Sequence, residues 1–292
     1  MKQTQAFLST YTADVSGVCS ALFELGGMTV MHDASGCNST YNTHDEPRWY
    51  DMDSLVYISG LSELEAVLGD DEKLISDITD AARQLHPRFI ALAGTPIPMI
   101  TGCDLPAIAR EVERRTEIPS FAVPSNGIGS YVSGAGQALR LYAERFITKK
   151  AEKKKNAVNI LGATPLDFSV NGCVQEMARR LQDAGFTVQS VFAMGSDISA
   201  IEKASAAEAN LVVSSVGLPA AQYLQKTFGI PYVVGAPFGD LLSPVLFDAL
   251  RRSIRTGENT HVLSLFAPHA PDTVVIGESV TAKSLAAALA MG

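Results

Sequence analysis

The sequence is poor in cysteine, and this scarcity excludes several kinds of metal and redox site. Only four cysteines occur among 292 residues: Cys19, Cys37, Cys103 and Cys173. No two of them form a Cys-x-x-Cys pair, which rules out a zinc knuckle or a thioredoxin-type motif. A single free cysteine is most often a small buried apolar residue, and we expect this of each cysteine taken alone.

Other missing features narrow the possible functions. No run of roughly 20 apolar residues could cross a bilayer, and the polar start of the chain, broken by Gly17, is unlike an export signal. We therefore expect a cytoplasmic protein with no membrane partner. No P-loop sequence occurs, so we expect no ATP site in this chain. A net charge of −8 disfavours nucleic acid, whose phosphates need a basic face, and is compatible with a basic partner protein.

The residues that are present predict an α/β fold. In the first half, apolar runs typical of strands at 28–32, 89–93 and 120–123 alternate with helical patterns at 63–85, 105–115 and 131–146, the first of these broken at Gly69. The second half repeats this order, with strands at 159–162, 187–192, 211–214 and 232–234, and helices at 172–184, 198–207, 220–228 and 244–256. Such alternation indicates βαβ units and doubly wound parallel sheets, which bind ligands at the carboxyl ends of their strands.

A run of like charge divides the chain. The sequence TKKAEKKKN at 148–156 is typical of a solvated linker. We therefore predict an N-terminal Rossmann-like domain at 1–148, a basic linker at 149–156 and a second Rossmann-like domain at 157–260. We expect residues 261–292 to form a further β/α unit, with a strand at 273–279 and a helix at 282–290. This unit either packs back onto an earlier domain or is the truncated start of a third one.

One glycine-rich segment could suggest a dinucleotide site. Residues 126–134, NGIGSYVSG, contain Gly-x-Gly between a strand and a helix, but the Gly-x-Gly-x-x-Gly spacing is missing. A tight turn that opens a helix explains the segment better, and we expect no NAD site.

Several stretches, taken in order, resemble one known family. They are GGMTVMHDASGC at 26–37, VLGDDEKL at 67–74, IALAGTPIPMITGCDL at 90–105 and the strand, loop and helix at 121–138, followed by NILG, DAGF and FGIPYVVGAPFG in the second half. Together they are similar to the nitrogenase component 1 family, which includes the nitrogenase MoFe protein, cofactor-maturation scaffolds and dark-operative protochlorophyllide reductases. The resemblance covers nearly the whole chain and implies an oxidoreductase subunit. Such a subunit receives electrons from an ATP-dependent iron–sulfur reductase through a bridging cluster and reduces a substrate in an interdomain cleft.

The resemblance also implies where a cluster would be held. The family's bridging cluster typically has three cysteine ligands per subunit, and Cys37 matches the second of these positions. Asp14 stands near the first position, as a carboxylate does in some light-independent protochlorophyllide reductases, and Pro96 stands at the third. Cys19 and Cys103 lie near these two positions in sequence. A helix N-terminus at Cys103 would favour its thiolate.

A [4Fe–4S] cluster normally needs four thiolates. Two subunits related by a two-fold axis would supply four if Cys37 and either Cys19 or Cys103 converge in each, which implies a homodimer or a pseudo-symmetric heterodimer. His32 either hydrogen-bonds near the cluster or is satisfied by the backbone. The residues after the Cys37 turn, His44, Asp45, Glu46 and Arg48, either line the same interface or form a solvated loop.

The ligands of the family's large metal cofactor have no counterpart in this sequence, and this bears on the substrate and on the alternative functions. No cysteine follows Cys173, and His261 and His269 do not stand where the family holds its large metal cofactor. A tetrapyrrole or another organic substrate is therefore favoured over dinitrogen. Apolar residues near strand ends would form its pocket or simply fill the core: Phe168, Phe192, Met194 and Phe238. The alternatives are a non-catalytic maturation scaffold or carrier without the cluster, and a separately expressed part of a longer component 1 protein.

Overall fold

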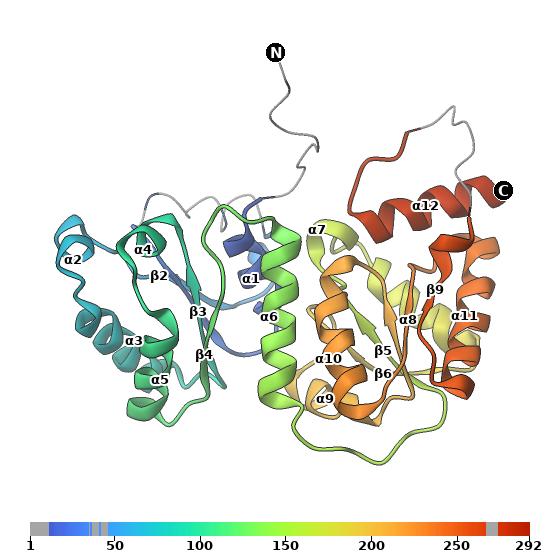
Figure 1. Ribbon diagram of the computed structural model, residues 1–292, viewed down its shortest axis with the longest axis horizontal. Coiled ribbons are helices and arrows are strands. Elements are labelled where there is room, and N and C mark those ends of the chain that lie inside the picture. Colours follow the sequence, from blue (N-terminus) through green and yellow to red (C-terminus); the bar gives the residue numbers. More distant parts are fainter. Residues whose placement is uncertain (1–11, 35, 37–40, 42–45, 267–273) are drawn as a thin grey trace.

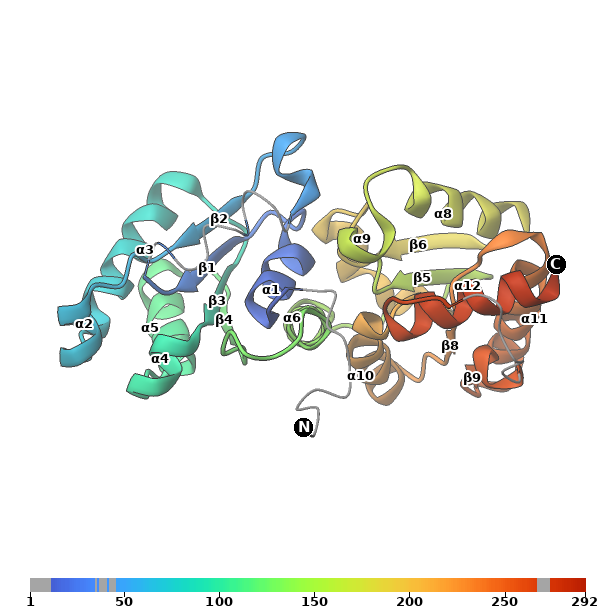
Figure 2. The same cartoon turned by 90° about the horizontal axis from the view of Figure 1, so that it is seen from above.

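The computed structural model describes residues 12–34, 36, 41, 46–266 and 274–292. It contains two separate parallel sheets, and helices cover both faces of each (Figures 1 and 2). This arrangement confirms the predicted α/β class with Rossmann-like sheets.

The first sheet has the strand order β2-β1-β3-β4, with β1 at Met28–His32, β2 at Leu55–Ile58, β3 at Ile90–Gly94 and β4 at Ser120–Val123. The sequence analysis did not anticipate β2. Alternate side chains of β1 and β3 point to opposite faces. One face packs against α3 (Asp71–Leu85) and α5 (Leu105–Thr116), and the other against α1 (Asp14–Leu22) and α6 (Tyr131–Phe146).

Helices α1 and α6 approach each other closely because glycines lie between them. A Cβ atom on Gly17 would come within 2.2 Å of the Tyr131 carbonyl oxygen, and one on Gly134 within 1.9 Å of the Asp14 carbonyl oxygen. Neither contact leaves room for a side chain. These two glycines therefore fix the start of α1 against the start of α6.

The second sheet has the order β6-β5-β7-β8-β9, with β5 at Ala157–Leu161, β6 at Thr187–Val191, β7 at Ala209–Val212, β8 at Tyr232–Val234 and β9 at Thr260–His261. Helices α8 (Cys173–Asp183) and α11 (Gly239–Thr256) cover one face. Helices α9 (Ile198–Glu202) and α10 (Leu218–Phe228) cover the other, and α10 packs against α6 of the first half. One apolar core thus runs from the first sheet through α6 into the second (Figure 1).

The C-terminal unit differs in part from the expectation. Residues 274–278 form no strand, so the predicted strand at 273–279 is wrong over its described part. The predicted helix exists as α12 (Ser279–Met291) and packs back onto α11. Glu278 anchors it, because its carboxylate accepts hydrogen bonds from the backbone N–H of Val280 (3.0 Å) and of Ser215 (3.1 Å).

Candidate functional site

The candidate residues of the first half gather at the carboxyl edge of the first sheet. Strand β1 pairs with β3, and His32, the last residue of β1, lies opposite Gly94, the last residue of β3. The residues that follow the two strands therefore leave the sheet at the same edge. Elements that follow strands in both halves lie on one side of the molecule in Figure 1. They are α4 (Pro96–Thr101), the loop before α6, and α7 (Pro165–Phe168). Both carboxyl edges therefore face the same side.

His32 is buried at this edge and is hydrogen-bonded. Its Nδ1 lies 2.9 Å from Ser59 Oγ, and its carbonyl accepts a hydrogen bond from Thr95 Oγ1 at 2.8 Å. Burial lowers the pKa of the imidazole, although the carboxylates of Asp71, Asp33 and Glu65 oppose this shift. The structure thus favours a neutral imidazole whose ring is hydrogen-bonded to a side-chain hydroxyl rather than to the backbone. A role for His32 near a cluster stays a prediction.

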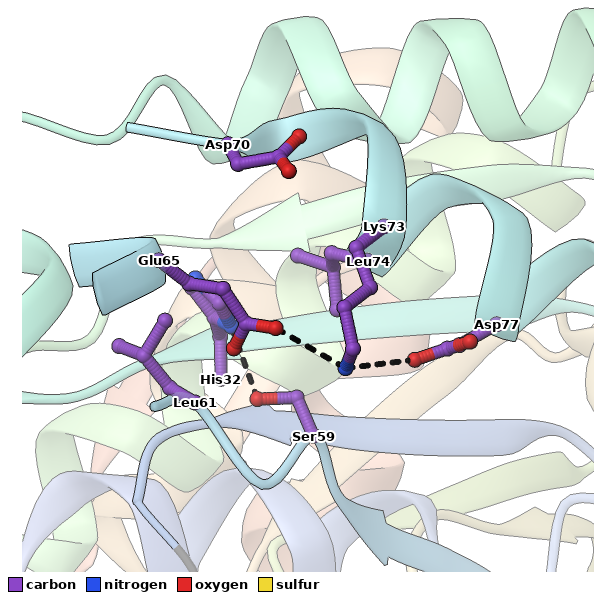
Figure 3. Close-up of a pocket in the computed structure, with 8 residues that line it drawn as sticks. All are labelled: His32, Ser59, Leu61, Glu65, Asp70, Lys73, Leu74 and Asp77. Carbon is purple, nitrogen blue, oxygen red and sulfur yellow. Dashed lines mark hydrogen bonds and ion pairs between the residues drawn. The ribbon is translucent and has the colours of Figure 1, made fainter. Parts of the chain in front are cut away.

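A small polar pocket lies beside His32, with a volume of about 10 Å³ (Figure 3). Lys73 reaches across it, with its Nζ 3.3 Å from Glu65 Oε1 and 3.1 Å from Asp77 Oδ2. Glu65 also accepts a hydrogen bond from the backbone N–H of Ser62 at 2.8 Å, which completes a capping box for α2 (Glu63–Leu68). A pocket of this size holds about one water molecule and leaves no space for an organic substrate. The ion pair between Lys73 of α3 and Glu65 of α2 holds these two helices together.

Asp14 holds the glycine-rich loop before α6. Its Oδ1 accepts hydrogen bonds from the backbone N–H of Val15 and of Gly127, both at 2.8 Å, and its Oδ2 accepts one from Asn126 at 3.0 Å. The Asp14 N–H in turn donates to the Gly129 carbonyl at 2.9 Å. Gly127 has φ +73°, and the loop is a tight turn that opens α6, as predicted. The carboxylate therefore already has a structural role in this fold.

Pro96, at the third ligand position of the family, also has a structural role. It begins α4, where its missing N–H costs no helical hydrogen bond. A Cβ atom on Gly127 would come within 2.4 Å of Pro96 Cδ, so the proline ring packs directly on the loop that Asp14 holds.

The described cysteines do not converge. Cys19 is fully buried in the core between α1 and α6, and burial, with a further contribution from Glu46, raises the pKa of its thiol. Cys103 is half-buried on the opposite face of the sheet, with its Sγ 3.8 Å from Asp71 Oδ1. Burial and the Asp71 carboxylate raise the pKa of Cys103 to about 12. Cys173 lies in the second half, at the start of α8. Cys37 lies outside the described residues.

A thiolate-bound iron–sulfur cluster needs several cysteine side chains close to one centre. Within the described part of the chain, no three His, Cys, Asp or Glu side chains are arranged to hold a metal ion. The raised pKa of Cys103 disfavours its thiolate, contrary to the effect expected from a helix N-terminus, because burial and Asp71 outweigh the helix dipole. The described residues by themselves therefore do not fit a [4Fe–4S] cluster.

A buried ionic network joins the two halves, and sequence reasoning did not find it. Arg48, in the 3-10 helix η2 (Pro47–Tyr50), forms a bidentate pair with Glu46, at 2.6 and 2.8 Å, and a further pair with Glu24 at 2.9 Å. Its Nη1 also donates to the carbonyl of Ala193 at 3.1 Å, and Glu24 Oε2 accepts from the backbone N–H of Gly195 at 2.8 Å.

Glu46 and Arg48 are each only 3% exposed, so the interpretation of a solvated loop is wrong for both. His44 and Asp45 lie outside the described residues. No local sequence signal distinguishes such a pair from surface charges, since its partners at 193–195 are distant in the chain.

The four apolar residues considered for a substrate pocket fill the core instead. Phe168, Phe192 and Met194 are buried, and the rings of Phe168 and Phe238 pack 6.5 Å apart. The structure describes no helix long and apolar enough to span a membrane.

Two helix-covered parallel sheets whose carboxyl edges face the same side define a protein built from two Rossmann-like halves. The sequence pattern of the family described as "Nitrogenase component 1 type Oxidoreductase" matches residues 16–250. The chain belongs to this family.

Relatives with curated names agree. The chain is 32% identical over 184 residues to a light-independent protochlorophyllide reductase subunit of Synechococcus elongatus, a match that covers 59% of this chain and 36% of the relative. It is 26% identical over 185 residues to the nitrogenase iron-molybdenum cofactor biosynthesis protein NifE of Clostridium pasteurianum, which covers 63% of this chain and 40% of the relative. A solved structure titled "Nitrogenase Cp1 at pH 5" has a TM-score of 0.67 at 20% identity, covering 87% of this chain and 56% of that one, and it supports the fold. The matches span well under half the length of these curated relatives.

Proposed function

We propose that this chain is the catalytic-component subunit of a two-component reductase. The observation that carries the proposal is the family match over residues 16–250, together with two carboxyl edges that face the same side of the molecule. Parallel sheets bind ligands at that edge. A ligand lying across it would contact both halves, which α6, α10 and the Arg48 network hold together.

The proposed reaction is the addition of two electrons and two protons to a conjugated double bond of an organic, tetrapyrrole-like molecule. In this proposal the electrons come from a separate ATP-dependent iron–sulfur reductase, the donor that membership of the family implies. Relatives named as protochlorophyllide reductase subunits support this substrate class.

We further propose that two copies of this subunit, or this chain and a similar one, share the cluster ligands. Cys37 stands at a cysteine ligand position of the family. Cys103 is the more accessible candidate for a second ligand, because it is partly exposed whereas Cys19 is fully buried in the core. A bound cluster would supply one-electron carriage. The described residues do not hold such a cluster by themselves, so the partner's ligands and Cys37 would be needed to complete it.

The second candidate is a maturation scaffold or carrier that kept the fold and not the cluster. Two observations favour it specifically: Asp14 is hydrogen-bonded to three backbone N–H groups, and Pro96 packs on the loop that Asp14 holds. Both of these family ligand positions thus have structural roles here. The relative named as a cofactor biosynthesis protein is in keeping with this candidate.

Anaerobic purification distinguishes the two candidates. The reductase proposal expects iron and acid-labile sulfide in the purified protein, and loss of both together with a weaker dimer in Cys37→Ala, because metal binding is also assembly energy for a shared site. Cys173→Ala, in the other half, is the matched control and should keep its iron. Iron-free wild-type protein whose dimer is unchanged by Cys37→Ala would overturn the reductase proposal and leave the scaffold.

A further inference from the structure

Helix α12 lies across the carboxyl edge of the second sheet, where it contacts the segments that follow three neighbouring strands. Its N-cap Glu278 accepts a hydrogen bond at 2.5 Å from the hydroxyl of Ser215, which comes soon after β7. Ser284 Oγ accepts one at 2.9 Å from the backbone N–H of Ala236, just after β8. The helix also packs on η5 (Val262–Leu265), which follows β9. Figure 1 shows α12 on the same side of this sheet as α7, which follows β5.

The start of α12 covers the topological switch point of the second sheet. Strand β5 leads to α8, which packs on one face, and its neighbour β7 leads to α10, which packs on the other. The loops after β5 and β7 therefore diverge, and doubly wound sheets bind their ligands where such loops diverge. Ser215 begins the segment after β7 and is bonded to Glu278. The chain's own C-terminal helix thus occupies the position that a ligand of this sheet would take.

The contact between Glu278 and the segment after β7 is specific. Glu278 is 4% exposed, and its Oε1 accepts hydrogen bonds from both the N–H and the hydroxyl of Ser215. Its Oε2 accepts from the backbone N–H of Val280 and of Thr281, both at 3.0 Å. Burial raises the pKa of this carboxyl, but the hydrogen bonds outweigh burial, so the pKa is below its ordinary value. Glu278 is therefore an ionised side chain at neutral pH and fixes the start of α12.

The apolar contact beneath the rest of α12 is small. The buried residues of the helix are Val280, Ser284 and Ala287. Its larger side chains Leu285 and Leu289 are 41% and 59% exposed. Elements that bury few apolar side chains open locally at a lower free energy than the core does. Because the two polar contacts can be replaced by water, α12 can leave the edge while both sheets stay folded.

We propose that α12 is an autoinhibitory lid on the second sheet, which opens when an organic ligand binds at the switch point. Opening breaks the bond between Glu278 and Ser215 and the bond between Ser284 and Ala236. The class of ligand, a tetrapyrrole-like molecule, rests on the proposed function, since a planar macrocycle and α12 cannot share this edge. The lid itself follows from the placement of α12 and its small apolar contact.

One variant releases the lid. Glu278→Ala with Ser284→Ala removes both polar contacts and leaves Val280 and Ala287 in place. Its matched control is Ser62→Ala with Glu65→Ala, which removes the capping box of α2 in the first half and leaves the second sheet untouched.

A second variant holds the lid closed. A Cβ atom on Gly239, at the start of α11, would lie 3.9 Å from Ala288 Cβ, which is the spacing that a disulfide needs. Gly239→Cys with Ala288→Cys therefore joins α12 to α11 on oxidation. The reduced form of the same variant is its control, because it has the same strain of a cysteine at φ +66°. Wild type with and without reductant controls for the native cysteines.

The probe is protoporphyrin IX, and its fluorescence is titrated with the full chain. Apparent affinity is the intrinsic affinity multiplied by the fraction of open protein. We expect the oxidised variant to bind at least about tenfold more weakly than its reduced form, and the released variant at least about threefold more tightly than wild type. The α2 control should bind like the wild type. Without ligand, the amides of Ser215 and Ala236 should exchange hydrogen faster in the released variant and more slowly in the oxidised one.

The outcomes separate the lid from the proposed function. Porphyrin binding that is equal within twofold in the released, oxidised and reduced forms overturns the lid and leaves the proposed function standing. Lid-dependent binding by a protein that contains no iron keeps the lid while the reductase proposal fails. A released variant that is folded and binds no porphyrin overturns both.

Circular dichroism shows whether the released variant is folded. If it is not, the oxidised and reduced forms decide the question by themselves: weaker binding on oxidation supports the lid, and equal binding overturns it. Tighter binding on oxidation would make the closed α12 part of the binding site and would also overturn the lid.

Discussion

Arg48 Nη1 donates a hydrogen bond to the carbonyl oxygen of Ala193 over 3.1 Å, and this contact links residues 145 positions apart across the two halves of the molecule. Ala193 is one of the few non-glycine residues with positive φ, at +81°. This backbone conformation is unfavourable for an L-residue, and the hydrogen bond from Arg48 to the Ala193 carbonyl helps to hold it.

Removing Arg48 should destabilise the protein strongly. In Arg48→Met, the buried carboxylate of Glu46 and the partly buried carboxylate of Glu24 lose their cation, and we expect a loss of about 3–5 kcal/mol in the free energy of unfolding. Urea unfolding measures it. Arg83→Met breaks an exposed pair with Asp80 and should change stability by under about 1 kcal/mol. Equal losses in the two variants would contradict the structural role of the network.

The Asp14 carboxylate should protect the loop before α6. In Asp14→Ala, the N–H groups of Asn126 and Gly127 lose their acceptor, which should cost about 1–3 kcal/mol. Hydrogen exchange of these two amides should quicken before that of the sheet. Asp104→Ala also removes a helix cap but leaves this loop untouched, so exchange at 126 and 127 should stay slow. Unchanged exchange in Asp14→Ala would show that the clamp is not needed.

The thiols should differ in their reaction with iodoacetamide. The reactive species is the thiolate. Because the pKa of Cys103 is raised to about 12, its rate should rise about tenfold per pH unit from pH 8 to 10, without the plateau that a thiol of ordinary pKa near 8.5 begins to show. Cys19, fully buried, should react only on unfolding.

Asp71→Asn should lower the pKa of Cys103 and speed its alkylation, since it removes a negative charge beside the sulfur. Asp77→Asn, on the same helix, is the matched control. Peptide mapping by mass spectrometry gives the rate at each cysteine. A levelling of the Cys103 rate below pH 9 would contradict its raised pKa.

His32 should make stability fall as the solution is acidified. Its pKa is lowered in the folded protein, so below about pH 6.5 the unfolded chain takes up a proton that the folded chain does not. The stability advantage of wild type over His32→Gln should therefore shrink from pH 7 to pH 5 in urea unfolding. His261→Gln, at an exposed position, is the matched control. An advantage that grows towards acid pH would mean that the folded imidazole carries the charge.

Sequence alone determined the elements whose signals are local. The strand Met28–His32 is a short apolar run, the break at Gly69 needs a left-handed residue, and the turn at Gly127 needs positive φ; each of these is written in neighbouring residues. The family resemblance was likewise readable, because its motifs keep their order along the chain.

Tertiary structure decided the environment of each side chain. Asp14 and Cys103 lie at or near family ligand positions, yet one is satisfied by amides of residues 126 and 127 and the other is disfavoured as a thiolate by Asp71. Arg48 is buried because Glu24, Glu46 and the carbonyls of Ser20 and Ala193 surround its guanidinium. Helix α2 shows its apolar face because none of the described elements covers it. Burial, hydrogen bonding and pKa depend on residues brought together from 32 positions apart, for Asp71 and Cys103, to 145 positions apart, for Arg48 and Ala193, and no local pattern records which ones meet.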